Sequence, residues 1–187
     1  MKMKNYLISV ILILLMVSPL FGKSADEKRF AFRTAFFANS LTYNLDEQNG
    51  IGFHFGQLSQ EINENNVEKG VNSFIGFNYG YAFDCINCDS FFVVTLLGTG
   101  SSIFTTNDGS TYTYTGWGLN VVGGYGWYFE NDISVLLGIG PSYSSASKES
   151  ENLKSDKGYG NDVEDRVKKL SFQPISSIPL FLVGYSF

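Results

Sequence analysis

The sequence predicts an all-β protein, specifically an eight-stranded antiparallel up-and-down transmembrane β-barrel. Hydrophobic residues alternate with small or polar ones over most of the chain, which is typical of β-strands because successive side chains point to opposite faces. Charged residues make up only 17% of the 187 residues, against about a quarter in ordinary soluble domains. The chain also combines 20 glycines with an aromatic content of 16%, a mixture that is neither helical nor disordered.

The first 24 residues differ from the rest. Met1–Asn5 is basic, Tyr6–Val17 is an apolar run, and Ser18–Ser24 brings small residues and a proline. This order predicts a secretory signal peptide, residues 1–24, cleaved near Gly22 or Ser24. A membrane-anchoring helix is the alternative, but the apolar run is short for it. Residues 25–187 are then one exported barrel domain.

The alternation predicts eight strands. The first two are short and are separated by a bend near Ala38–Asn39. The strands cover residues 29–36, 41–45, 51–56, 71–83, 91–106, 116–129, 133–143 and, starting near Leu170, the end of the chain. The predicted loops and turns are Gln60–Gly70, Asp84–Asp89, Asn107–Ser110, Glu130–Asp132 and Lys148–Lys169.

Charged residues avoid the predicted strands. None occurs in Ser90–Asn107, Gly109–Phe129 or Ile133–Ser147, whereas 12 fall within Lys148–Lys169. That segment has six acids and six bases and is interpreted as a solvated, flexible loop, or as a surface that contacts a ligand.

The two faces of the strands favour a membrane barrel over a soluble one. Along residues 116–129, one face carries bulky residues such as Trp117, Leu119 and Trp127, and the other is mostly Gly and Asn. Gly, Ser and Asn suit the narrow interior of a small barrel, so the bulky face meets lipid, with aromatic residues near the strand ends. The sheet must close, because an open edge in hydrocarbon leaves backbone groups unpaired at a cost of several kcal/mol each.

The last strand alternates up to the final residue. Phe181, Val183, Tyr185 and Phe187 form its bulky face. Because chain ends usually fray, an amphipathic strand that runs to the terminus favours a closing role in the barrel.

From about Arg29 to Phe187 the chain resembles the small eight-stranded outer-membrane barrels of the OmpX and opacity-protein type. The resemblance is carried by Gly124–Phe129, the tight turn and Gly-rich strand that follow, and the terminal Gly184–Phe187. It implies a location in the bacterial outer membrane, in contact with outer-membrane lipid and lipopolysaccharide. It also implies that the barrel-assembly machinery reads the last strand, with Phe181, Val183, Tyr185 and Phe187 as the signal.

The same resemblance implies an orientation and a role. Both termini and the turns Asp84–Asp89 and Glu130–Asp132 would lie in the periplasm, and Gln60–Gly70 and Lys148–Lys169 would be surface loops. The family includes adhesins and complement-resistance proteins, so the expected function is structural or is surface binding of a host or environmental ligand. Two alternatives stay open: a lipid-modifying outer-membrane enzyme, and a secreted soluble barrel that binds a small apolar ligand.

Cys85 and Cys88 are predicted to form a local disulfide. A redox site of the thioredoxin type needs a helix N-terminus beside the first thiol, and a structural zinc site needs four ligands. In an exported protein, a disulfide that pins the turn is the better interpretation. With so short a loop it contributes about 2 kcal/mol.

The remaining polar residues predict an interior rather than an active site. Arg33, His54, Asn72, Asn78 and Asn120, together with Asn44, project inward by the alternation. A hydrogen-bonded polar filling is expected, since an eight-stranded lumen is too narrow to conduct.

No enzyme activity or cofactor is expected. Phe53–Gln57 does not match the His motif of lipid-modifying barrels, which leaves His54 as an interior residue. Gly98-Thr99-Gly100 lacks the third glycine and the helix of a dinucleotide site. The net charge of −5 provides no basic patch for nucleic acid.

Overall fold

A computed structural model describes residues 29–35, 38–64, 66–154, 159–170, 172–173 and 180–187. The predicted signal peptide lies outside these residues. Within them the protein is all-β, with one helix. The elements are β1 (Phe30–Thr34), β2 (Ala38–Asn44), β3 (Asn49–Glu64), β4 (Val67–Ala82), β5 (Ser90–Thr106), β6 (Thr111–Tyr128), β7 (Ile133–Ile139), β8 (Ser142–Asn152), α2 (Gly160–Leu170), β9 (Phe172–Gln173) and β10 (Leu180–Ser186).

Antiparallel pairing closes a ring of eight strands, in the order β1, β2, β3, β4, β5, β6, β7 and β10. The ring closes where β1 pairs with β10, from Ala31 opposite Ser186 to Thr34 opposite Val183. No helix in the described part of the chain has the length and apolar character needed to cross a membrane.

The seventh strand is interrupted. The sequence predicted one strand over residues 133–143, but the structure breaks it into β7 and β8 at Gly140 and Pro141. Proline has no N–H to donate to a neighbouring strand. Its carbonyl still accepts a 3.0 Å hydrogen bond from the Val121 N–H, so β8 continues beside β6.

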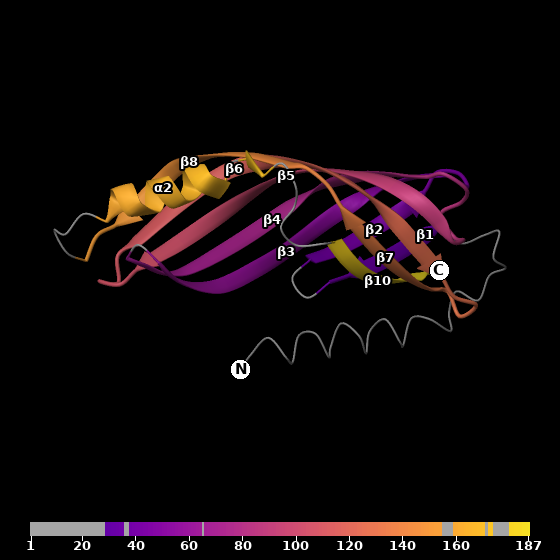
Figure 1. The fold of residues 1–187 in the computed structure, drawn as a ribbon, viewed down its shortest axis with the longest axis horizontal. Coiled ribbons are helices and arrows are strands. Elements are labelled where there is room, and N and C mark those ends of the chain that lie inside the picture. The colour runs from indigo at the N-terminus through magenta and orange to yellow at the C-terminus, as the bar shows by residue number, and fades with distance from the viewer. Residues whose placement is uncertain (1–28, 36–37, 65, 155–158, 171, 174–179) are drawn as a thin grey trace.

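The wall of the ring is unequal in height (Figure 1). Pairing of β2 with β3 stops at Ala38 opposite Gly56, and pairing of β10 with β7 stops at Leu180 opposite Gly138, whereas β3–β6 and β8 continue. We call the part beyond Gly56 the extension. It consists of residues 57–64, 67–73, 101–106, 111–115 and 147–152 together with α2.

The structure in and beside the extension corrects three predictions. Gln60–Gly70 is not a loop, because β3 and β4 continue through most of it, and Asn66, in the turn before β4, has φ 63°. Asparagine tolerates this left-handed conformation better than most residues. The described parts of Lys148–Lys169 are also ordered elements, the end of β8 and α2. Leu170 therefore ends a helix, and the last ring strand begins at Leu180 instead.

A small hydrophobic core holds the extension together. Val163 of α2 is fully buried, in a cluster with Val67, Phe104, Tyr112 and Tyr114. The four partners come from β4, β5 and β6, so α2 covers the inner face of the extension. Helix packing of this kind, rather than helix propensity, stabilises short helices in proteins.

The opposite end of the molecule, which we call the turn end, consists of the turns at residues 45–48, 83–89 and 129–132. The Ile86 N–H donates to the Glu47 carbonyl at 2.7 Å, and the Tyr128 N–H donates to the Asp89 carboxylate at 2.7 Å. These bonds tie neighbouring turns and strands together. Asp84–Asp89 and Glu130–Asp132 thus share one end, away from the extension.

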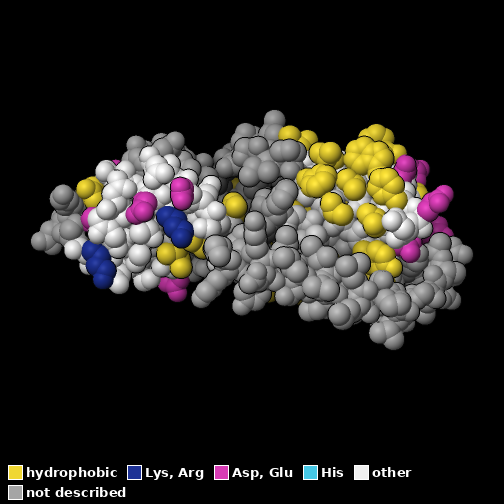
Figure 2. All heavy atoms as spheres, turned by 90° about the horizontal axis from the view of Figure 1, so that it is seen from below, with side chains coloured by type: hydrophobic (Ala, Val, Ile, Leu, Met, Phe, Trp, Pro, Cys, Tyr) yellow, Lys and Arg dark blue, Asp and Glu magenta, His cyan; other side chains and the backbone are white. Residues whose placement is uncertain are grey.

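The outside of the ring is apolar. Phe77 is 64% exposed, Phe91 63% and Ile75 59%. We call these outward residues the apolar belt, and Figure 2 shows hydrophobic side chains gathered over one end of the molecule. Its members include Phe30, Leu41, Ile51, Phe53, Phe55, Ile75, Phe77, Tyr79, Phe91, Leu97, Trp117, Leu119, Val121, Trp127, Leu137, Ile139, Tyr143, Phe181 and Val183.

The belt ends at a row of polar residues that lie side by side on adjacent strands. The row is Gln57, Ser73, Ser101, Thr115 and Ser147. Two rows further out, Glu61 lies opposite Lys69. The polar row therefore marks the point where the apolar ring gives way to the polar outer face of the extension.

Candidate functional site

The ring and the adjoining part of the extension surround a cavity of about 1010 Å³, and side chains from every ring strand line it. Its lining divides into two walls. The strands β1–β4 contribute a polar wall that includes Arg33, Ser40, Thr42, His54 and Asn78. The strands β5–β7 and β10 contribute an apolar wall of Phe92, Val94, Leu96, Val122, Leu136, Leu180 and Leu182.

The residues predicted to project inward lie at this cavity. Arg33, His54, Asn72, Asn78 and Asn120 all line it. Asn44 is buried near the turn end and is not among the lining residues. The structure thus brings five of the six predicted interior residues to one space.

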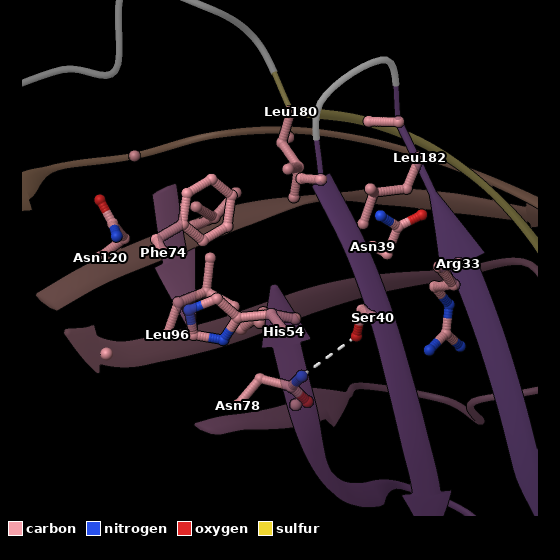
Figure 3. A pocket seen from close by; sticks show the side chains of 18 of the residues that line it. Arg33, Asn39, Ser40, His54, Phe74, Asn78, Leu96, Asn120, Leu180 and Leu182 are labelled. Atoms are coloured by element: carbon pink, nitrogen blue, oxygen red, sulfur yellow. Dashed lines mark hydrogen bonds between the residues drawn. The ribbon is translucent and has the colours of Figure 1, made fainter. Parts of the chain in front are cut away.

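Hydrogen bonds join the polar wall across three strands. Asn78 Nδ2 donates to Ser40 Oγ at 3.1 Å (Figure 3). Ser40 and Thr42 share a hydrogen bond of 3.4 Å between their hydroxyl oxygens, and Arg33 Nη1 donates to Thr42 Oγ1 at 3.3 Å. The polar wall is therefore a connected network from β4 through β2 to β1.

Arg33 is buried, with 8% of its surface exposed. Its stem lies over Gly184 of β10, since a methyl group there would meet Arg33 Cγ at 2.6 Å and Ser134 Oγ at 2.9 Å. Glycine at this position leaves room for both side chains. Neither Arg33 Nε nor Ser134 Oγ has a hydrogen-bond partner among the described residues.

His54 lies against glycines on two neighbouring strands. A Cβ at Gly76 would come within 2.7 Å of His54 Cε1, and one at Gly98 within 3.2 Å of His54 Nε2. The ring also lies 6.0 Å from that of Phe74, centre to centre. The hydrogen bonds within the described residues do not join this imidazole to a hydroxyl or carboxylate side chain, the arrangement that activates a nucleophile.

The predicted disulfide joins Cys85 and Cys88 in the turn between β4 and β5. Both cysteines and Ile86 between them line the cavity. The methyl of Ile86 reaches the inner face beside Gly50, 3.4 Å from where a Cβ would stand. The pinned turn therefore folds inward and covers the cavity at the turn end.

The predicted assembly residues all lie on the outer face of β10 or directly after it. Phe181 and Val183 are exposed in the apolar belt, and Tyr185 is partly buried. Phe187 exchanges backbone hydrogen bonds of 2.8 and 3.0 Å with Phe30. The last residue of the chain is thus paired to the start of β1.

Sequence reasoning missed the apolar wall. The inward face of β10 carries Leu180 and Leu182 in alternation with Gly184, and that of β7 carries Leu136 beside Ser134. The alternation of the sequence therefore predicts that these leucines point inward. The sequence predicts a small, polar interior, whereas these leucines line the cavity. Leucines on both faces of a strand are the signal that indicates a partly apolar lumen.

The outer surface of the extension is polar and held in place by local bonds. Asn66 Nδ2 donates to the Asp162 carboxylate at 3.0 Å, which ties the β3–β4 turn to the first turn of α2. An acidic residue there also favours the helix dipole. At the next tip, Asp108 accepts hydrogen bonds from the N–H and hydroxyl of Ser110.

Within the described residues, no group of three His, Cys, Asp or Glu side chains is placed to hold a metal ion. Comparison with models of protein families, with curated proteins and with solved structures gives no match for this chain. The candidate site therefore has to be interpreted from its own geometry.

Proposed function

We propose that the protein is an integral outer-membrane β-barrel whose extension projects from the membrane and serves as a surface-binding module. The apolar belt is the observation that carries this proposal. Contiguous apolar patches beyond a few hundred Å² are rare on soluble monomers, and this belt surrounds a ring in which each strand is paired on both sides. A closed ring has no edge, which is the condition for β-strands to stand in hydrocarbon.

The height of the belt supports a membrane crossing. On β6 it runs from Trp117 to Trp127, both exposed. At a rise of about 3.3 Å per residue and a tilt of about 45°, these ten or so residues span roughly 23 Å. The apolar band of outer-membrane barrels is about 25 Å tall.

Aromatic pairs at the edges of the belt add support. Phe91 and Tyr125 lie 4.9 Å apart near the turn end, and Tyr125 and Trp127 5.1 Å apart. At the other edge Trp117 and Tyr143 are 5.4 Å apart. Aromatic rings gather at membrane–water interfaces because they combine an apolar body with a polar edge.

The extension is the part suited to bind a partner in water. It has its own core and a polar outer face, so it can hold a fixed surface beyond the membrane. Binding residues commonly lie on such projecting segments, positioned by a rigid scaffold. The resemblance to adhesins and complement-resistance proteins of the small-barrel family is in keeping with this role, with a host or environmental ligand at the extension.

Two cysteine reporters test both location and orientation. Glu149 lies in the extension and Asn131 at the turn end, and both are exposed. The described chain has no free thiol, so Glu149→Cys and Asn131→Cys each introduce a single reactive site. On intact cells, a membrane-impermeant maleimide is expected to label only the Glu149→Cys variant, and both variants after lysis.

Fractionation completes the experiment. The protein is expected in the outer-membrane fraction, to need detergent for extraction, and to migrate faster on gels before heating than after. Recovery as a detergent-free soluble monomer would refute the membrane proposal. Labelling of Asn131→Cys alone on intact cells would mean that the orientation is the opposite of the proposed one. It would also rule out the extension as the surface-binding module.

A further inference from the structure

The interior of the ring has the two-sided character of a site for an amphipathic molecule. Figure 3 shows Leu180 and Leu182 facing the same space as Arg33 and Ser40. An interior filled with water and polar side chains would not need an apolar wall, and a purely apolar cavity would not contain an arginine. This feature is independent of the proposed role of the extension, which concerns the outside of the molecule.

Arg33 is the charged group of this interior. Burying a guanidinium is costly unless its charge is paired and its N–H groups are hydrogen-bonded. Here Nη1 donates to the neutral hydroxyl of Thr42, and Nε has no partner among the described residues. The ion pair that the described residues do form, between Lys148 and Glu151, lies in the extension. The position beside Arg33 therefore suits a carboxylate supplied from outside the chain.

A second polar side chain, that of Ser134, approaches the stem of Arg33. Ser134 on β7 lies opposite Gly184 on β10, and Gly184 lies opposite Arg33 on β1. With no side chain on Gly184, Arg33 Cγ and Ser134 Oγ both lie within 3 Å of one point above it. Ser134 is 3% exposed, and its hydroxyl has no hydrogen-bond partner among the described residues. The stem of Arg33 thus passes beside the Ser134 hydroxyl, and a carboxylate lying between that hydroxyl and the guanidinium would accept hydrogen bonds from both.

The apolar wall begins directly beside this position. Leu182 is the next inward residue after Gly184 on β10, and Leu136 is the next after Ser134 on β7. Both line the cavity, followed by Leu180 and by Val122 on β6. A chain attached to a carboxylate at Arg33 would therefore run along apolar side chains from its first carbons onward.

We propose that the lumen binds a linear-chain carboxylic acid, with its carboxylate on Arg33 and Ser134 and its hydrocarbon chain along the leucines of β7 and β10. The cavity volume, about 1010 Å³, is at the upper end of the usual range for small-molecule pockets, roughly 300–1,000 Å³. The guanidinium selects the acid group, and the apolar wall selects the chain.

Calorimetric titration of the purified protein in octyl glucoside micelles tests this, with protein-free micelles as the blank. Three probes separate the two halves of the site: dodecanoate, dodecanol and acetate. Dodecanoate is expected to bind one-to-one. Dodecanol lacks the charge and loses the charge-assisted hydrogen bonds, so it is expected to bind at least about tenfold more weakly. Acetate lacks the chain and loses the apolar contacts, so it is also expected to bind at least about tenfold more weakly.

Variants locate the site. Arg33→Gln is expected to weaken dodecanoate binding more than about tenfold, and Ser134→Ala by about tenfold, while neither changes dodecanol binding. Arg29→Gln is the matched control, because Arg29 is exposed and donates outside the lumen to Tyr43. This variant should bind dodecanoate like the original chain.

Several outcomes would overturn the proposal. Dodecanol binding as tightly as dodecanoate would mean uptake by the apolar wall or the micelle alone, and acetate binding as tightly would mean a bare anion site. Unchanged dodecanoate binding by a folded Arg33→Gln variant would also exclude the site. If Arg33→Gln does not fold, judged by heat-modifiable migration, Ser134→Ala and the three probes decide.

Discussion

Gly76, Gly98 and Gly118 lie side by side across β4, β5 and β6, and His54 is the next residue in the same row on β3. The imidazole occupies the space that side chains at the first two glycines would take. A Cβ at Gly76 would meet the Leu97 carbonyl as well as the imidazole. The size of these residues, more than their chemistry, determines what the lumen can hold at this level.

Replacing Gly76 with Ala is therefore expected to destabilise the ring. The added methyl group meets backbone that cannot move away, and overpacking of this kind costs about 1–3 kcal/mol. Gly80→Ala is the matched control on the same strand and face, since its methyl would have Val94 Cγ2 at 3.4 Å as its nearest neighbour. Urea unfolding from lipid vesicles measures both, and equal midpoints for the two variants would contradict the packing argument.

Asp46 provides a pH-dependent contribution at the turn end. Its carboxylate accepts hydrogen bonds from Asn49 Nδ2 and from the Gln48 and Asn49 N–H groups. The Asn49 side chain first, and then these backbone groups, hold the pKa of Asp46 below its ordinary value of 3.8.

A lowered pKa in the folded state means that the carboxylate stabilises the fold at neutral pH and loses this effect as the pH falls below the ordinary pKa and through the lowered one. Asp46→Ala should therefore melt at a lower temperature than the original chain at neutral pH, and the gap should narrow in acid. Thermal unfolding from pH 7 to pH 3 measures the gap. A gap that is constant over the whole range would show that the ionised carboxylate plays no part.

At the scale of elements, α2 is stabilised by packing against the inner face of the extension. Its sequence is highly charged, and the side chain that anchors it is Val163, buried against the aromatic residues of β5 and β6. Gly160 begins the helix close to Tyr112, where an added Cβ would lie 3.4 Å from the ring. The helix and the inner face of the extension therefore depend on each other.

Val163→Asp is expected to detach α2 without opening the ring. A carboxylate cannot remain unpaired in this apolar cluster, so trypsin should cleave within Lys148–Lys169 much faster than in the original chain. Heat-modifiable migration should be unchanged, because the cluster lies beyond the ring. The control is Asp165→Ala, an exposed position two residues along the helix, which should keep the original cleavage rate.

The sequence predicts the ring strands much better than the extension, for a physical reason. In the ring, the outer face is aromatic or aliphatic and the inner face has many small residues, so the period of two is clear from residues 116 to 129. In the extension both faces of Gln60–Gly70 are largely polar, and Ile62 and Val67 are too few to reveal a strand. Its core depends on Val163 meeting Tyr112 across about fifty residues, which no local pattern contains.

The alternation of the sequence predicts which side chains point into the interior, but not which of them lie next to one another. Alternation was enough to direct Arg33, His54 and Asn78 inward, and the CxxC spacing in a chain expected to be exported was enough to predict the disulfide. Whether Arg33 meets a partner depends on Gly184 and Ser134, which lie far along the chain. Their convergence follows from the closure of the ring and is visible only in three dimensions.

At the scale of the whole molecule, the boundary between belt and extension is the main feature. It crosses β5 between Leu97 and Ile103, both exposed aliphatic residues on its outer face. The polar row at Ser101 separates them. Leu97 and Ile103 are thus chemically similar, but we propose that Leu97 contacts lipid and that Ile103 contacts water.

Leu97→Arg is expected to destabilise the protein in lipid vesicles by about 1–2 kcal/mol, because the cost of an arginine on the lipid face falls from about 2–4 kcal/mol at the bilayer midplane toward the interface. Ile103→Arg, beyond the polar row, should change the free energy of unfolding by less than about 0.5 kcal/mol, as is usual for surface substitutions. Urea unfolding in vesicles measures both. Equal effects of the two substitutions would show that the belt is not in contact with lipid.

The short pairing of β1 with β10 has a consequence for how the ring opens and closes. Along β3–β6 each strand pairs with its sequence neighbour through a long ladder, whereas the seam at β1 covers only Phe30–Thr34 and residues about 150 positions away. Such a seam pays the largest loop-closure entropy, so it should form last in folding and show the fastest amide hydrogen exchange. Arg33 on β1 and Ser134 on β7 lie on either side of β10, so an occupant bound to both would fasten the seam from inside.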